Sequence, residues 1–314
     1  MLSIKSNLFG GAVGAPFRKL AEERVLLETQ IFNLLKCNYK KEKVMTLEKL
    51  CEIIELQDEM KRQVLTLAGE MDFAPLEAHI IALTDPACAA DAYAALKETV
   101  GEEMPGAKIL CCYLRAALIT YEKYQELGVD DAIYIETMKC FPRFVGECLA
   151  RRDEIGFDRA FWSYRQLSFT LVRIGTLEYE WRLRKGEKII SIHIPSDADL
   201  SHEALAASYT AARKFLREKV PEYAEAPITC ESWLLYEGLA DLLRPDSGIL
   251  RFQRCFDIKH QNPPHNGCLH FIFQRQDCSD FATLPERTSL QRNVKKLLLS
   301  GGGISSGYGV LKEG

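Results

Sequence analysis

The 314-residue sequence has no apolar run that approaches the roughly 20 residues needed to cross a membrane as a helix. It also has no internal repeat of fixed period and no low-complexity segment. Its 40 lysines and arginines are scattered among 44 acidic residues, so the net charge is only −4 and no basic stripe stands out. These absences argue against a membrane protein, a repeat protein and nucleic acid as a partner.

The amino terminus lacks the firm apolar segment and the cleavage site of a secretion signal, because Gly and Pro interrupt residues 1–20. These residues match no recognisable pattern, and we expect them to be disordered. The 11 cysteines form an odd set without the tight spacing of a disulfide framework, which is typical of reduced thiols. The sequence therefore predicts a cytoplasmic protein.

The spacing of apolar residues changes near residue 160. Helical spacing prevails before this point, most clearly over 47–71 and 107–128. After it, helices and strands mix, and Lys185-Gly186 forms a turn between two strands. The expected strands are 177–182, 188–195, 228–235 and 268–274, and the expected helices are 201–220, 236–245 and 285–299. Residues 247–260 fit either a helix followed by a strand or one continuous strand.

Several stretches of the second half carry a resemblance to a known family. They read FWSYRQLSFTLVRIGTLEYEW at 161–181, SIHIP at 191–195, SWLL at 232–235, PDSGILRFQRCF at 245–256 and GYGVL at 307–311. In these stretches the chain resembles bacterial acyltransferases that join a helical amino-terminal domain to a GNAT-like carboxy-terminal domain. The resemblance implies an α+β fold, with an all-α domain over 1–160 followed by a GNAT-like mixed, largely antiparallel α/β domain over 161–314. It also implies transfer of an acyl group to an amine.

The resemblance further implies that strands 188–195 and 228–235 splay apart, and that acyl-CoA or acetyl-CoA inserts between them as co-substrate. Such enzymes hold the pyrophosphate in a Q/R-x-x-G-x-G/A loop that opens the next helix. The loop here, PSDADLS at 195–201, has no glycine, and its two aspartates oppose an anion. This departure supports a second hypothesis: a GNAT-derived module that binds a small ligand or a protein without catalysis.

His193 is the sharpest candidate for a general base. Strand alternation places Ser191 and His193 on one face and Ile190, Ile192 and Ile194 on the other. Histidine titrates near neutrality, so it could accept the proton of the amine. The alternative is a half-buried histidine bonded to a neighbouring backbone group or to Ser191.

Four further residues come from the strand 228–235 and the segment after it. Glu231 is a second candidate base, or an exposed glutamate at a sheet edge. The resemblance implies that Ser232 and Trp233 line the substrate pocket and that Tyr236 returns a proton to the leaving thiolate. Alternatively, Ser232 satisfies local backbone, Trp233 belongs to the core and Tyr236 is a solvated hydroxyl at a helix start.

A metal site was weighed for His260, His265, Cys268, His270 and Cys278. These residues lack a paired C-x-x-C unit, and we expect no metal. The terminal glycines, 301–309, have no helix after them to hold phosphate, so they predict a helix C-cap and turn followed by a short closing strand. The expected partner is a small-molecule amine or a peptide, with no nucleic acid and no membrane; the oligomeric state stays open.

Overall fold

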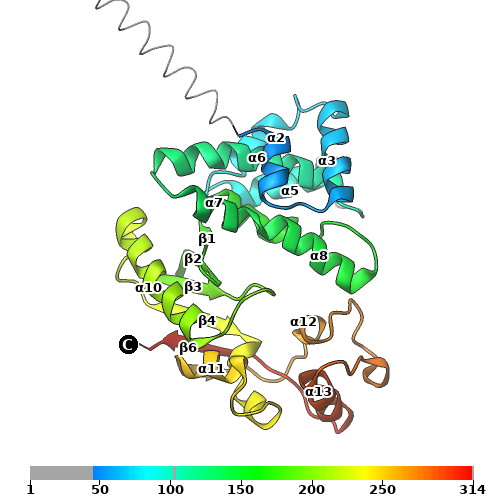
Figure 1. The fold of residues 1–314 in the computed structure, drawn as a ribbon, viewed down its shortest axis with the longest axis vertical. Helices are drawn as coiled ribbons and strands as arrows, with labels where there is room; N and C mark the ends of the chain where they lie inside the picture. The colour runs from blue at the N-terminus through cyan, green and yellow to red at the C-terminus, as the bar shows by residue number, and fades with distance from the viewer. Residues whose placement is uncertain (1–44, 102–103, 313–314) are drawn as a thin grey trace, which may run out of the picture. The chain divides into compact units, whose positions relative to one another are not determined.

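A computed structural model describes residues 45–101 and 104–312. The expected disorder of residues 1–20 lies outside the described residues. From Leu47 onward the chain forms one compact unit, in which the helices that precede the sheet gather beside β1 (Figure 1). The fold class expected from the sequence, helices followed by a mixed and mostly antiparallel sheet, is confirmed.

The helical region is organised around one long buried helix, α6. Residues at nearly every position along it are buried, from Ile109 to Tyr124, because it contacts helices on several sides. It ends at Glu126, and Gly128, the residue after the C-cap Leu127, has a φ of +61°, the left-handed conformation expected just beyond a helix end. The helices are α2 (Leu47–Ile53), α3 (Asp58–Glu70), α4 (Glu77–Ala82), α5 (Ala89–Val100), α6 (Ala107–Glu126), α7 (Asp131–Met138), α8 (Cys140–Arg152) and α9 (Ala160–Leu167).

The segment 47–71, expected to be one helix, is two. Glu55 has a φ of +63°, and the Leu56 N–H donates to the carbonyl of Cys51, which ends α2. This turn keeps both Ile54 and Leu56 buried, at 0% and 4% exposure. A continuous helix would place these two residues on different faces, so burial of both favours the break.

Six strands of the described chain form one sheet in the order β1-β2-β3-β4-β6-β5. Neighbouring strands are antiparallel except β3 and β4, which are parallel over Ile190–Ile192 and Ile228–Cys230. This parallel pair is the one that the sequence assigned to the centre of the sheet. The strands are β1 (Leu171–Ile174), β2 (Leu177–Arg184), β3 (Glu187–His193), β4 (Ile228–Ser232), β5 (Phe256–Gln261) and β6 (Gly307–Leu311).

The two faces of the sheet differ in polarity. The register pairs Tyr179 with Ile192, and on this apolar face helix α10 (His202–Lys219) packs against β1 and β2 (Figure 1). The buried hydroxyls of Tyr179 and Ser208 lie 2.8 Å apart, and Ser208 donates to the carbonyl of Ile174. The opposite face carries Glu178, Glu180, Ser191 and His193, as strand alternation predicts.

The remaining elements form a second hydrophobic core beside strands β4, β5 and β6. Helices α11 (Gly248–Arg254), α12 (Leu269–Phe273) and α13 (Ser289–Leu299) surround it, with 3₁₀ turns at Trp233–Leu235 and Glu237–Asp241. Residues 247–260 are a helix followed by a strand. The expected strand at 268–274 is wrong: it is the short helix α12, because Leu269, Ile272 and Phe273 are buried at helical spacing.

The terminal glycines form a turn after α13 and then the closing strand, as the sequence predicts. Gly301 has a φ of +84° after α13, and Gly307 and Gly309 lie on β6. A Cβ at Gly307 would lie 2.5 Å from the carbonyl oxygen of Leu235, so only glycine fits there. β6 completes the sheet between β4 and β5.

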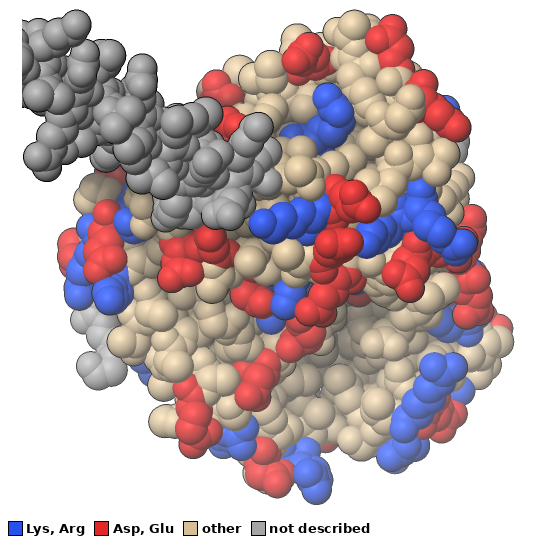
Figure 2. All heavy atoms as spheres, turned by 45° about the horizontal axis from the view of Figure 1, so that its top comes forward, with Lys and Arg blue, Asp and Glu red and all other residues tan. Residues whose placement is uncertain are grey.

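Acidic and basic side chains alternate over the face drawn in Figure 2, and neither sign gathers into one patch. No helix of the described residues is long and apolar enough to span a membrane.

Replacing Ser208 with alanine should lower the free energy of unfolding by about 1–3 kcal/mol, because the buried Tyr179 hydroxyl and Ile174 carbonyl lose a partner. Thr210→Ala removes an exposed hydroxyl from the same helix and should change it by less than about 0.5 kcal/mol. Urea unfolding of both variants measures the difference. Equal effects would contradict the role given to Ser208.

Candidate active site

His193 lies at the carboxyl end of β3, just beyond the last paired residue of the parallel strands. Its Nε2 atom is 2.8 Å from Oε2 of Glu180, on the neighbouring strand β2. The His193 side chain is 23% exposed and the Glu180 side chain is 12% exposed. The histidine is therefore reachable from solvent while its carboxylate partner is largely covered.

Two arginines share the Glu180 carboxylate with His193. The Nε atom of Arg165 on α9 is 3.2 Å from Oε1, and the Nε atom of Arg182 is 3.7 Å from Oε2. Burial alone would raise the pKa of Glu180, but the hydrogen bond and charge of His193 and the charges of both arginines outweigh it. The pKa of Glu180 is therefore lowered, and its carboxylate stays ionised at neutral pH.

This contact sets which nitrogen of His193 is available. An ionised carboxylate only accepts hydrogen bonds, so Nε2 must carry the proton that it donates to Glu180. In the neutral imidazole, Nδ1 then carries the lone pair and can take a proton from a bound molecule. The arrangement is that of a base held by a carboxylate.

Trp162 forms the third side of the site. Its ring lies edge-on to the His193 ring, with centroids 4.8 Å apart and an interplanar angle of 85°. The guanidinium of Arg165 lies 4.4 Å from the Trp162 ring centroid, so one arginine contacts both the tryptophan and Glu180. Helix α9 thus contacts His193 directly through Trp162 and indirectly through Arg165, which binds Glu180.

Sequence reasoning missed Glu180 and Trp162 as site residues. Glu180 could have been found from the two-residue turn Lys185-Gly186, whose φ values of +52° and +85° suit a tight hairpin. A two-residue turn pairs Arg184 with Glu187, and counting back places Glu178 and Glu180 beside Ser191 and His193. No comparable local signal marks Trp162.

The other predicted site residues lie in separate surroundings. Glu231 is half exposed and pairs with Arg184, whose guanidinium lies 3.9 Å from the Tyr308 ring centroid. The Ser232 hydroxyl accepts from the N–H of Leu234 and caps a 3₁₀ turn. Within the described chain, no hydrogen bond joins Glu231 or Ser232 to His193.

Trp233 and Tyr236 follow β4 and are not on the strand itself. Trp233 begins the 3₁₀ turn, and both rings pack against the second core. The Tyr236 ring also covers the backbone of Gly238, where a Cβ would lie 2.5 Å from a ring atom. Their roles toward a substrate stay predictions.

The acidic loop after His193 is bonded to its own chain. The Nη1 atom of Arg173 is 3.0 Å from each carboxylate oxygen of Asp197, and the Asp199 carboxylate accepts from Ser201. The Ser201 hydroxyl caps α10 by accepting from the N–H of Ala204. Because the charge of Asp197 is neutralised and Asp199 closes a local turn, this loop opposes an anion less than its sequence implies.

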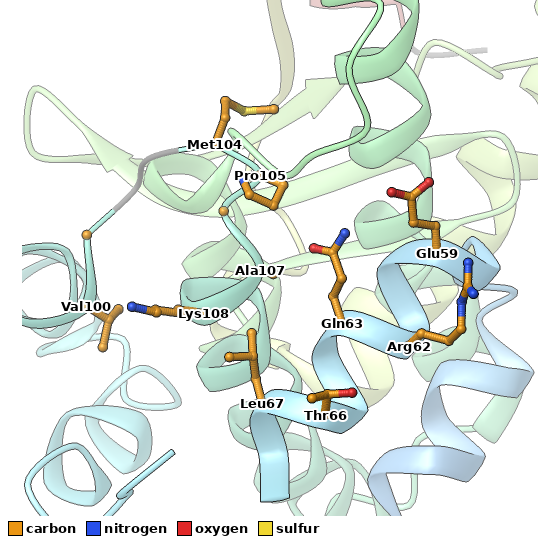
Figure 3. Close-up of a pocket in the computed structure, with 12 residues that line it drawn as sticks. Glu59, Arg62, Gln63, Thr66, Leu67, Val100, Met104, Pro105, Ala107 and Lys108 are labelled. Carbon is orange, nitrogen blue, oxygen red and sulfur yellow. The ribbon is translucent and has the colours of Figure 1, made fainter. Parts of the chain in front are cut away.

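A cavity of about 560 Å³ opens elsewhere, in the helical region (Figure 3). It lies between α3 and the start of α6, with Leu67, Val100 and Met104 among its walls and Arg62 and Lys108 at its edge. Neither His193 nor Glu180 lines it. The His193 arrangement is the better candidate for chemistry, because it joins a histidine that can take up a proton to an ionised carboxylate.

The residues weighed as a metal site do not converge. His265 lies 3.3 Å from the Ser306 hydroxyl, and Cys268 is buried in the second core. Among the described residues, no group of three or more His, Cys, Asp or Glu side chains is placed to hold a metal ion.

Two family models match the chain in succession. The model of the N-acyltransferase N-terminal domain matches residues 45–169, and that of the GNAT-like C-terminal domain matches residues 166–311. The chain belongs to the N-acyltransferase family that carries a GNAT-like C-terminal domain.

The fold is also similar to solved acyltransferases. One, in complex with decanoyl-CoA and teicoplanin, has 21% identity and a TM-score of 0.68 over 84% of this chain and 87% of that one. A mutant acyltransferase in complex with octanoyl-CoA also has 21% identity, over 84% of this chain and 87% of that one, with a TM-score of 0.70. At this identity the likeness shows the fold. No curated protein sequence matches the chain.

The lowered pKa of Glu180 predicts how stability depends on pH. Because the folded pKa lies below the unfolded value, the ionised carboxylate stabilises the fold above about pH 4.3, and this is lost as the pH falls through the folded pKa. Wild type should therefore exceed Glu180→Gln in free energy of unfolding at pH 6, and the difference should shrink at pH 3. Denaturant unfolding across this range measures it, with the exposed Glu218→Gln as control. A difference that stays constant with pH would rule out the ionised pairing.

Proposed function

We propose that this protein transfers an acyl group from an acyl-CoA thioester to an amine by direct attack, with His193 as general base. The observation that carries the proposal is His193 itself, held through Nε2 by Glu180 at the end of the central parallel strands. Acyltransferases of similar fold contain decanoyl-CoA, octanoyl-CoA and teicoplanin, which supports an acyl-CoA donor and a small-molecule or peptide acceptor.

The chemistry needs one base on the acceptor side. The amine nitrogen forms a bond to the thioester carbonyl carbon, and its proton passes to Nδ1 of His193. The tetrahedral intermediate then expels the CoA thiolate, which takes up a proton, and the amide remains. The ionised Glu180 stabilises the imidazolium formed on His193, as a buried carboxylate does for a histidine base.

The remaining predicted residues take secondary places in this proposal. Tyr236 is the candidate donor of the proton to the thiolate, and Ser232 and Trp233 are candidates for the pocket wall. Glu231 is the weaker candidate base, because its carboxylate already pairs with Arg184 and has no hydrogen bond to His193. A non-catalytic binding module is the alternative, supported by the glycine-free loop 195–201.

We also propose a division into a helical domain, 1–160, and a GNAT-like domain, 161–314, in a bacterial, cytoplasmic protein. The chain's described cysteines are free thiols, which fits a reducing compartment where CoA thioesters are available.

His193→Gln should lower amine-dependent release of CoA by about 10²–10⁴-fold, because the attacking amine loses its base. The assay follows free CoA thiol with acyl-CoAs of increasing chain length and a panel of amines and peptides. His260→Gln, an exposed histidine on β5, should leave the rate unchanged.

Two results would separate the hypotheses. If wild type binds acyl-CoA but releases no CoA with any acceptor above the buffer rate, the binding module is favoured. If His193→Gln keeps the wild-type rate, His193 is not the base.

A further inference from the structure

A second polar cluster lies where α8, the segment before α9, and α12 meet. Arg159 directly precedes α9 at the N-cap position, and its guanidinium lies 5.8 Å from the Phe161 ring centroid. The residue is half-buried, yet no hydrogen bond or ion pair joins its side chain to any described residue. A half-buried cation without a counter-ion is unfavourable unless a ligand supplies one.

Arg151, one helix earlier, shows a second missing partner. Its side chain is 7% exposed, and its Nη atoms bind Asp158 at 2.9 Å and Gln276 at 3.0 Å. Its Nε atom is buried and has no acceptor within the described structure. An unsatisfied buried N–H costs about 1–3 kcal/mol, so this donor points to an acceptor that is not part of the protein.

The acidic side chains of this cluster are already engaged. The Asp158 carboxylate accepts from Arg151 and from Nε of Arg152 at 3.4 Å. The Glu147 carboxylate accepts from the Ser196 hydroxyl at 2.6 Å and lies 3.9 Å from Nη1 of Arg143. Both carboxylates act on Arg159 only through their charge, and neither forms a hydrogen bond or ion pair with it.

Arg159 and His270 each lie near a neighbouring arginine charge. Burial, followed by the charge of Arg151, lowers the pKa of Arg159 despite Asp158 and Glu147. Burial, followed by the charge of Arg159, lowers the pKa of His270 on α12. Arg159 also stands at the positive end of α9, which no side chain caps.

This cluster is connected to the candidate active site at two points. Arg159 lies three residues before Trp162, which contacts His193. Glu147 bonds to Ser196, in the loop that follows His193. Three large exposed apolar side chains come from the same elements, and one of them, Phe161, contacts Arg159; they are Leu149 at 44%, Phe161 at 47% and Phe271 at 54%.

We propose that Arg159 and Arg151 form an anion subsite that holds a carboxylate or phosphate group of one of the two substrates. The identity of that substrate rests on the proposed function, whereas the oxyanion chemistry does not. An oxyanion there would supply the acceptor that the Arg151 N–H lacks and the counter-ion that Arg159 lacks. The apolar frame would accept the less polar part of the same molecule.

Inorganic phosphate, titrated into protein with ¹⁵N-labelled arginines, tests the subsite without turnover. The Nε–H signals of Arg159 and Arg151 should shift saturably in wild type, and Arg159→Gln should weaken phosphate binding by at least about tenfold. Arg159→Lys should lie between the two, and it keeps the test readable if the glutamine variant folds poorly. Arg244→Gln, whose parent side chain is 83% exposed, should bind as wild type does.

The result that overturns the proposal is an absence of saturable shifts in wild type, or equal phosphate affinity in wild type and Arg159→Gln. If the subsite binds phosphate but no acyl-CoA is ever turned over, the proposed function fails while the subsite stands.

Calorimetry with CoA and with dephospho-CoA, which lacks the 3′-phosphate, identifies the source of the anion. If the 3′-phosphate of the donor supplies it, Arg159→Gln should weaken CoA binding about tenfold and leave dephospho-CoA binding unchanged; if the pyrophosphate of the donor supplies it, both should weaken. If the acceptor supplies it, both affinities should stay the same. In that case the KM of acceptors with a carboxylate should rise in the variant, and the KM of their amide counterparts should not.

Discussion

A buried carboxylate is stable only when its charge is paired, and Glu180 of β2 is paired three ways, with His193, Arg165 and Arg182. Two residues earlier on the same strand, Glu178 is 3% exposed and pairs with Arg143 of α8. The two glutamates of β2 therefore bind side chains from α8, from α9 and from β3. Removing Arg143 would leave Glu178 as an uncompensated buried charge, so this pair specifies how α8 lies against the sheet, and the Arg165–Glu180 pair helps to do the same for α9. The orientation of His193 follows from that arrangement.

Charge pairing also explains the conformation of the loop after His193. This loop lacks the glycines that let a backbone wrap around a phosphate. Its two aspartates, however, are not left without partners. Arg173 neutralises Asp197, and Asp199 fastens the loop to the start of α10. The free positive charge lies instead at Arg159, on the helical side of the site. In the proposed subsite, arginine side chains would take the place of a glycine-rich loop in holding an anion.

Much of the fold follows from periodicity, because long stripes of buried residues determine their own secondary structure. The closing strand at Gly307–Leu311 was predicted from the sequence, and the central strands β3 and β4 were implied by the family resemblance. The helix at Leu269–Phe273 was not, because five residues are too few to distinguish two periods. His193 was predicted from the strand face on which it lies. Glu180 could have been predicted from the register of the hairpin that joins β2 to β3. The Arg143–Glu178 and Arg173–Asp197 pairs could not, since they join residues 35 and 24 apart whose meeting depends on tertiary packing.

Glu180 holds His193 with its proton on Nε2 and its lone pair on Nδ1. Long-range ¹H–¹⁵N correlation of the His193 ring, in wild type and in Glu180→Gln, tests it most directly. Above pH 7, wild type should show a protonated Nε2 and an unprotonated Nδ1, and the variant should show a mixture of tautomers. A protonated Nδ1 in neutral wild-type His193, or identical spectra for the two proteins, would contradict the account.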